Sequence, residues 1–113
     1  MPKQDSFHEY VMSEVFREIP NVTSRKMFGG FGIYQNGIFF ALIDQGELYF
    51  KVDEGNLKDC EAQGSKPFVY KGHNGREVTM SYWLLPADIL EDIDKLSDWV
   101  EKSVEAAKRG KKR

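Results

Sequence analysis

Histidine and cysteine are the side chains that most often bind metals or attack substrates, and this sequence has few of them. It holds two histidines, His8 and His73, and a single cysteine, Cys60. A structural zinc site uses four such ligands, usually in close pairs, whereas these three are widely spaced. We therefore predict no metal site and no cofactor. Cys60 shares the apolar side of a short predicted helix with Leu57, which is typical of a buried small hydrophobic residue.

Carboxylates could supply acid–base chemistry, and many of them lie in the last predicted helix, at 88–98. They fall mainly away from its apolar stripe, a pattern typical of a solvated helix face. The sequence also lacks the G-x-S-x-G motif that positions a nucleophilic serine. We predict no catalytic residues and no enzyme activity.

The glycines at 29, 30 and 32 superficially resemble a phosphate-binding loop. A dinucleotide fingerprint lies between a strand and a helix, but this cluster leads into a strand, and Gln35 occupies the position of the third glycine. Glycines in such a place more often mark a bulge or a close approach of two backbones. We expect one of these two structural roles here, in place of phosphate binding.

Charge divides the chain into an acidic body and a basic end. The net charge is −2, yet residues 1–107 alone carry −7. An acidic body disfavours binding of nucleic-acid phosphates. The basic end at 108–113 is the candidate for such contacts, and the alternative is a frayed, solubilising terminus. The candidate residues are Lys108, Arg109, Lys111, Lys112 and Arg113.

Two long amphipathic helices are predicted, one near each end. Ser6 and Glu9 form an S-x-x-E capping box, after which apolar residues recur every four positions until Pro20. Pro86 is well placed to begin the last helix, whose apolar residues keep the 3.6-residue period for about five turns.

Turn pairs divide the middle of the chain into strands. Asn36-Gly37 separates strands at 31–35 and 38–43, and a third strand follows at 47–52. Asn-Gly is the preferred turn of a two-residue hairpin. A second hairpin, with arms at 67–71 and 76–85, follows the short helix of Cys60. The predicted fold is α+β, a two-layer α-β(3)-α-β(2)-α arrangement with a mainly antiparallel sheet and helices on one face.

At 113 residues the chain has the length of one domain. We expect a folded domain at 1–107 and a basic tail at 108–113. No apolar run approaches the roughly 18–20 residues of a membrane span, and the N-terminus has no signal-peptide pattern. With a single cysteine, these features favour a cytoplasmic protein.

Five separated segments of the sequence together resemble one known family. RKMFGGFGIY at 25–34 is similar to the opening signature of the TfoX/Sxy N-terminal domain family. GIFFALI at 37–43 and LYFKVD at 48–53 continue the match, and GSKPFVY at 64–70 and MSYWLLP at 80–86 complete it. The resemblance covers roughly residues 10 to 107, and several motifs in the right order make it specific.

The resemblance implies a secretion-chaperone-like fold with the element order already predicted. It also implies a bacterial cytoplasmic protein without catalysis, since the best-known relatives regulate DNA-uptake competence as coactivators with the cAMP receptor protein. Full-length regulators carry a second, helical domain. We expect this chain, which ends at Arg113, to be a single-domain member.

The resulting functional hypothesis is a regulatory protein–protein interaction module linked to transcription or competence. The sheet face that the helices leave open is the expected surface. Candidate residues lie at the strand entrance and in the last strand: Arg25, Lys26, Met27, Phe28, Tyr82 and Trp83. The partner would be a protein such as a transcription regulator, and self-association as a homodimer is also open. The alternatives are nucleic-acid binding through the basic tail and a small-molecule-binding domain.

Overall fold

A computed structural model describes residues 3–27, 30–71, 75 and 77–111 of the chain. Its centre is a six-stranded antiparallel sheet with the strand order β1-β2-β3-β4-β6-β5. The strands are β1 (Val22–Met27), β2 (Gly30–Gln35), β3 (Ile38–Asp44), β4 (Glu47–Lys51), β5 (Pro67–Lys71) and β6 (Glu77–Leu84). The prediction of an α+β fold with a mainly antiparallel sheet is confirmed.

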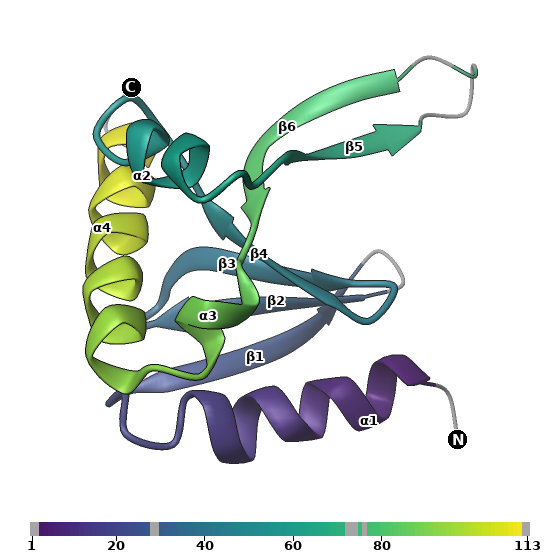
Figure 1. The fold of residues 1–113 in the computed structure, drawn as a ribbon. Helices are drawn as coiled ribbons and strands as arrows, with labels where there is room; N and C mark the ends of the chain where they lie inside the picture. Colours follow the sequence, from purple (N-terminus) through teal and green to yellow (C-terminus); the bar gives the residue numbers. More distant parts are fainter. Residues whose placement is uncertain (1–2, 28–29, 72–74, 76, 112–113) are drawn as a thin grey trace.

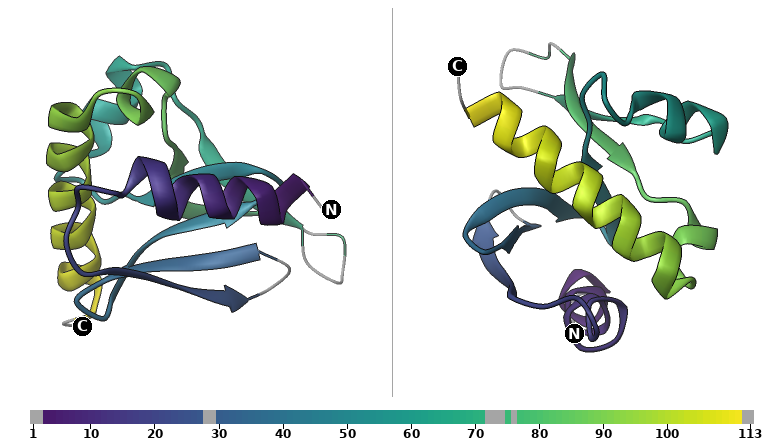
Figure 2. Two further views of the ribbon diagram at one scale, coloured as in Figure 1. Left: turned by 90° about the horizontal axis from the view of Figure 1, so that it is seen from below. Right: turned by 90° about the vertical axis from the view of Figure 1, so that its left-hand side faces the viewer.

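The helices come from both ends of the chain and from the middle. The helical segments are α1 (Lys3–Tyr10), the π-helical turn η1 (Val11–Val15), α2 (Leu57–Ala62), α3 (Ala87–Leu90) and α4 (Ile93–Lys111). Figures 1 and 2 show α1 running along the strands and α4 running across them at one end. The bond from the Phe16 amide to the Val11 carbonyl, at 2.9 Å, closes the wide π-helical turn.

The core lies between these helices and one face of the sheet. Phe16, just after η1, packs edge-on against Phe40 at 5.9 Å and lies 6.3 Å from Phe50. From α4, Leu96 and Val100 are almost fully buried in the same cluster. Burial of this many apolar side chains is the main stabilising contribution to a domain of this size.

Glycine-containing turns connect β2 to β3 and β3 to β4, as predicted. Asn36 has φ of 51° and Gly37 has φ of 81°, the two positive values that a type I′ hairpin turn requires. Gln45 and Gly46 repeat the arrangement between β3 and β4, with φ of 49° and 76°. These turns fix the register, and therefore decide which side chains share a face of the sheet.

The structure departs from the predicted elements in three places. A fourth strand, β1, precedes the three that were predicted before α2. The first helix begins at Lys3, so Ser6 lies inside it and the predicted capping box is wrong. The last predicted helix is divided, because the Asp92 carboxylate accepts the backbone N–H groups of Asp94 and Lys95 and begins a new helix there.

Ion pairs hold α4 to the segment around α2. Lys102 donates to the Asp59 carboxylate at 2.8 Å, and Arg109 binds both oxygens of Asp53 at 2.6 and 2.8 Å. Helix α4 therefore runs past the predicted domain boundary at Ala107 while still bonded to the body.

The β5–β6 hairpin extends away from the rest of the sheet. Only Tyr82, Trp83 and Leu84 of β6 pair with β4. Beyond them the hairpin diverges from β3 and β4 (Figure 1).

Within the described ranges, no helix is both long enough and apolar enough to cross a membrane.

Candidate interaction surface

The sheet face opposite the helices, here called the open face, carries a distinct set of side chains. On β4, Leu48 and Phe50 are buried in the core, while Tyr49 and Lys51 point the other way and are half-buried. The strand register then assigns the neighbours: Leu42 and Leu84 pair with Tyr49, and Tyr82 pairs with Lys51. The open face is therefore rich in large apolar and aromatic groups.

Three aromatic rings form a continuous row across this face. Tyr34 and Phe39 lie opposite each other across the β2–β3 hairpin, with ring centroids 5.2 Å apart. Phe39 in turn contacts Tyr82 at 5.6 Å. Contacts of this geometry each contribute about 0.5–1.5 kcal/mol beyond the area they bury. The rings also cover one another, so that Tyr82 is only 8% exposed.

A cation lies over each end of this row. The Arg25 guanidinium is 5.8 Å from the centre of the Tyr34 ring, and the Lys51 ammonium is 5.2 Å from the centre of the Tyr82 ring. Both distances allow cation–π attraction. We call the set Arg25, Tyr34, Phe39, Tyr82 and Lys51 the capped row.

Carboxylates gather at the other end of the open face. The Tyr49 hydroxyl donates to Glu47 at 2.8 Å, and its ring contacts Phe68 at 4.8 Å. Burial, the hydrogen bond to Glu47 and the charges of Glu47 and Asp44 all raise the pKa of Tyr49. Burial, followed by the charge of Glu47, raises the pKa of Asp44. The open face is therefore basic along the capped row and acidic near the β3–β4 turn.

Two glycines of the family-like motif shape this surface. A Cβ on Gly32 would lie 2.7 Å from the Met27 Cε and 3.1 Å from the Phe39 ring. With glycine at this position, these two side chains close over β2. A Cβ on Gly30 would lie 2.1 Å from the Ile43 carbonyl oxygen, a close backbone approach, which is one of the two structural roles expected from the sequence.

The six candidate interaction residues do not all lie on the same face of the sheet. Arg25 and Tyr82 belong to the capped row, and Met27 lies beside it on the same face. Lys26 pairs with Phe31 and Trp83 pairs with Phe50, so both lie on the face towards the helices. Phe28 lies outside the described residues.

Sequence reasoning did not select Tyr34, Phe39 or Lys51 among its candidate interaction residues. A signal for two of them was present. A two-residue turn at Asn36-Gly37 pairs Gln35 with Ile38 and Tyr34 with Phe39, so the turn type alone places those rings together. Lys51 could not be found this way, because its contact with Tyr82 depends on the non-local pairing of β4 with β6.

The basic end is only partly available for other contacts. Lys108 lies 3.4 Å from the Glu105 carboxylate, and Arg109 is paired with Asp53. Lys111 ends α4 and its side chain is not described, while Lys112 and Arg113 lie outside the described residues. The predicted nucleic-acid contact is not tested by these positions.

Of the two histidines and the cysteine, His8 and Cys60 have structural surroundings that account for them, and His73 lies outside the described residues. The His8 ring stacks flat on Phe31 at 3.8 Å and shares a 2.8 Å hydrogen bond with Ser24. Burial, with Asp59 and Glu61 nearby, raises the pKa of Cys60 to about 11, which disfavours the reactive thiolate. Among the described residues, no three His, Cys, Asp or Glu side chains gather closely enough to hold a metal ion.

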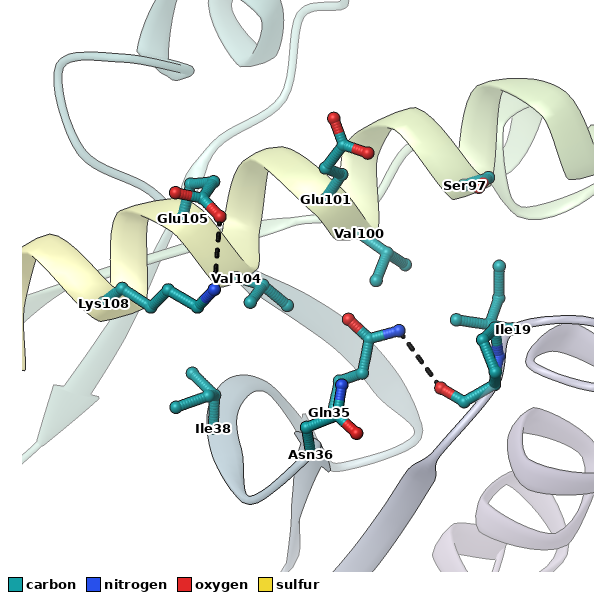
Figure 3. Close-up of a pocket in the computed structure, with 11 residues that line it drawn as sticks. Ile19, Gln35, Asn36, Ile38, Ser97, Val100, Glu101, Val104, Glu105 and Lys108 are labelled. Carbon is teal, nitrogen blue, oxygen red and sulfur yellow. Dashed lines mark hydrogen bonds and ion pairs between the residues drawn. The ribbon is translucent and has the colours of Figure 1, made fainter.

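A groove of about 320 Å³ lies between α4 and the β2–β3 turn (Figure 3). Its apolar lining is Ile19, Ile38, Val100 and Val104. The Gln35 amide donates to the Pro20 carbonyl at 3.1 Å, and Lys108 pairs with Glu105 at its edge. Much of its polar lining is thus bonded to other protein groups, whereas a specific ligand site presents convergent polar groups to the space.

Comparison with known proteins decides the family. The TfoX N-terminal domain family matches residues 14–107 of this chain. The chain belongs to the TfoX N-terminal domain family. It is also similar to the protein Sxy of Escherichia coli (strain K12), with 26% identity over 102 residues. That alignment covers 90% of this chain and 48% of Sxy, so the chain spans about half the length of this relative. The TfoX/Sxy family is associated with the regulation of competence.

Proposed function

We propose that this chain is a non-enzymatic regulatory module that binds another protein through its open face, in the control of transcription or competence. The capped row carries the proposal. It is a cluster of aromatic side chains on the face opposite the helices, with a cation at each end. Aromatic residues and arginine are the types most enriched where proteins bind one another.

Two tyrosines of the open face, the half-buried Tyr49 and the buried Tyr82, favour binding over catalysis. Burial, followed by the proximity of Tyr34, raises the pKa of Tyr82 to about 12. Both Tyr82 and Tyr49 therefore stay protonated near neutral pH and act as hydrogen-bonding apolar groups. A general acid or base would need a pKa close to the working pH.

Capture of partners from a nuclease-treated lysate tests this function. The full chain is compared with Tyr34→Ala, which removes a ring of the capped row, and with Tyr10→Ala. Tyr10 is a matched control, because it is 42% exposed and lies on α1. We expect the full chain and Tyr10→Ala to recover the same transcription-related protein, and Tyr34→Ala to lose it.

A shortened chain separates the competing function. Ending the chain at Gly110 removes Lys111, Lys112 and Arg113 but keeps the Arg109–Asp53 pair. Recovery that depends on these last residues or vanishes with nuclease would contradict the proposal and favour nucleic-acid binding. Equal recovery by the full chain and Tyr34→Ala would remove the open face from consideration.

A further inference from the structure

We infer that the open face binds an acidic segment of its partner, whose carboxylates pair with Arg25 and Lys51 and whose apolar side chain lies against Phe39 between them. The inference rests on the proposed function, since it names the chemistry of the partner for that same surface. The observation that supports the inference is the positive charge of Arg25 and Lys51 in the capped row.

The two cations of the capped row keep most of their hydrogen-bonding capacity. In the described part of the chain, Lys102, Lys108 and Arg109 are each paired with a carboxylate. Arg25 and Lys51 lie over aromatic rings, and Lys51 also donates to the Ser81 hydroxyl at 2.6 Å. The charge of Lys51 contributes to the lowered pKa of Asp53, although the Asp53 carboxylate is bonded to Arg109. An arginine offers five N–H donors and a lysine three, so each can donate to a carboxylate of the partner without giving up its ring contact.

The position of Phe39 determines which kind of side chain lies between the two carboxylates of the bound segment. Its ring is the middle one of the row and touches both neighbours. An apolar or aromatic side chain placed there would bury the centre of the row, while the charged contacts would lie at its rim. This arrangement of an apolar centre and a polar rim is the usual anatomy of a protein interface.

The acidic end of the open face orients the segment. Asp44 and Glu47 already raise the pKa of neighbouring groups, and another carboxylate near them would be repelled. An acidic segment is therefore directed along the capped row, across the strands, and away from the β3–β4 turn. Like-charge contacts of this kind exclude wrong orientations.

Single-stranded nucleic acid suits this surface less well. Base stacking needs free ring faces in a positive groove, but Arg25 and Lys51 lie over the outer rings of the row. The phosphates would also meet Asp44 and Glu47 on the same face. A broad, flat partner is disfavoured too, because the β5–β6 hairpin diverges from the plane of the other strands (Figure 1).

The test uses the full chain labelled with nitrogen-15 and the synthetic peptide Glu-Glu-Leu-Phe-Glu-Glu, titrated by nuclear magnetic resonance. The matched probe is Lys-Lys-Leu-Phe-Lys-Lys. We expect the acidic peptide alone to shift the amide signals of Arg25, Tyr34 and Lys51, with an affinity that falls as salt rises.

Charge reversal supplies the decisive variants. Arg25→Glu with Lys51→Glu should weaken binding of the acidic peptide by about tenfold or more. Lys26→Glu with Lys58→Glu makes the same change in net charge at two exposed positions, and Lys26 follows Arg25 on the opposite face of β1. We expect this control to bind the peptide like the original chain.

Several results would overturn the inference. These are equal binding of both peptides, no binding of the acidic one, unchanged binding by the Arg25 and Lys51 variant, or stronger binding of a thymidine oligonucleotide at the same residues. A chain that is dimeric in sedimentation, with its open face protected, would make a second copy the occupant. If Tyr34→Ala loses the captured protein but the charge-reversed variant keeps it, this inference fails while the proposed function stands.

Discussion

Gly30 lies against the backbone of β3, and its missing side chain is a structural requirement. An added Cβ would meet the Ile43 carbonyl oxygen at 2.1 Å, and that oxygen belongs to the backbone of a central strand. Such an overlap can be relieved only by moving a strand, because no flexible side-chain end is involved.

The Gly30→Ala variant is therefore expected to lose about 3 kcal/mol of the free energy of unfolding, or more. Urea denaturation of the purified chain measures it. Gly110→Ala is the control, because nothing lies within 4 Å of its added Cβ and alanine favours the helix. A Gly30→Ala chain as stable as the original would contradict the close approach of the two strands.

Ser103 is a polar residue whose side chain is buried among apolar groups. Its side chain is 1% exposed, and its hydroxyl has no hydrogen-bond partner among the described residues. Ser103→Ala should raise the free energy of unfolding by roughly 1 kcal/mol, since it removes an unpaired buried hydroxyl and adds a better helix former. A measured loss of stability in thermal unfolding would show instead that the hydroxyl is bonded in solution.

At the scale of elements, α4 is held to the β4–α2 connection by Asp53 and Arg109. The Arg109 side chain, and to a lesser degree the Gly55 amide, lower the pKa of Asp53 below its ordinary 3.8. A carboxylate whose pKa is lower in the folded state stabilises the fold fully at pH values above its unfolded-state pKa. This stabilisation is lost as the pH falls through the folded-state pKa.

Asp53→Asn should therefore reduce stability at neutral pH, and the difference from the original chain should shrink below about pH 4. The effect will be modest, because solvent screens a pair at the surface. Urea midpoints measured at several pH values check it, with Asp88→Asn, an exposed position on α3, as the control. A difference that stays constant down to low pH would contradict the assignment.

The elements also show how far sequence reasoning reaches. The β2–β3 hairpin was predictable because its Asn-Gly pair demands one backbone geometry. Helical structure near each end of the chain was predictable because the apolar residues there keep a helical period. Strand β1 was missed, since its sequence VTSRKM has few apolar residues and owes its pairing to β2. The break before α4 was missed because Asp92 acts through its own side chain within an otherwise continuous apolar pattern.

The candidate site was only partly predictable, because part of it depends on the facing of strand residues and on non-local strand pairing. Arg25, Met27 and Tyr82 were selected from local sequence and do lie on the open face. Lys26 and Trp83 were selected beside them, but neighbours in a strand point to opposite faces. Lys51 contributes through a contact with Tyr82, 31 positions further along the chain. Contacts at such separation depend on the whole topology of the sheet.

For the molecule as a whole, the two faces of the sheet differ in what covers them. One is covered by α1 and α4 and supplies the stability of the domain. The other presents the capped row, although residues 1–107 together carry a net charge of −7. A basic aromatic surface on an acidic body favours one orientation of approach for a negatively charged partner.

The most direct measurement of the central claim is photo-cross-linking in living cells. A photoreactive phenylalanine derivative replaces Tyr34 on the open face in one chain and Tyr10 on α1 in another, and the adducts are treated with nuclease. We predict a discrete protein adduct from position 34 and none from position 10. An adduct from position 10 with none from position 34 would contradict the assignment of the open face as the binding surface.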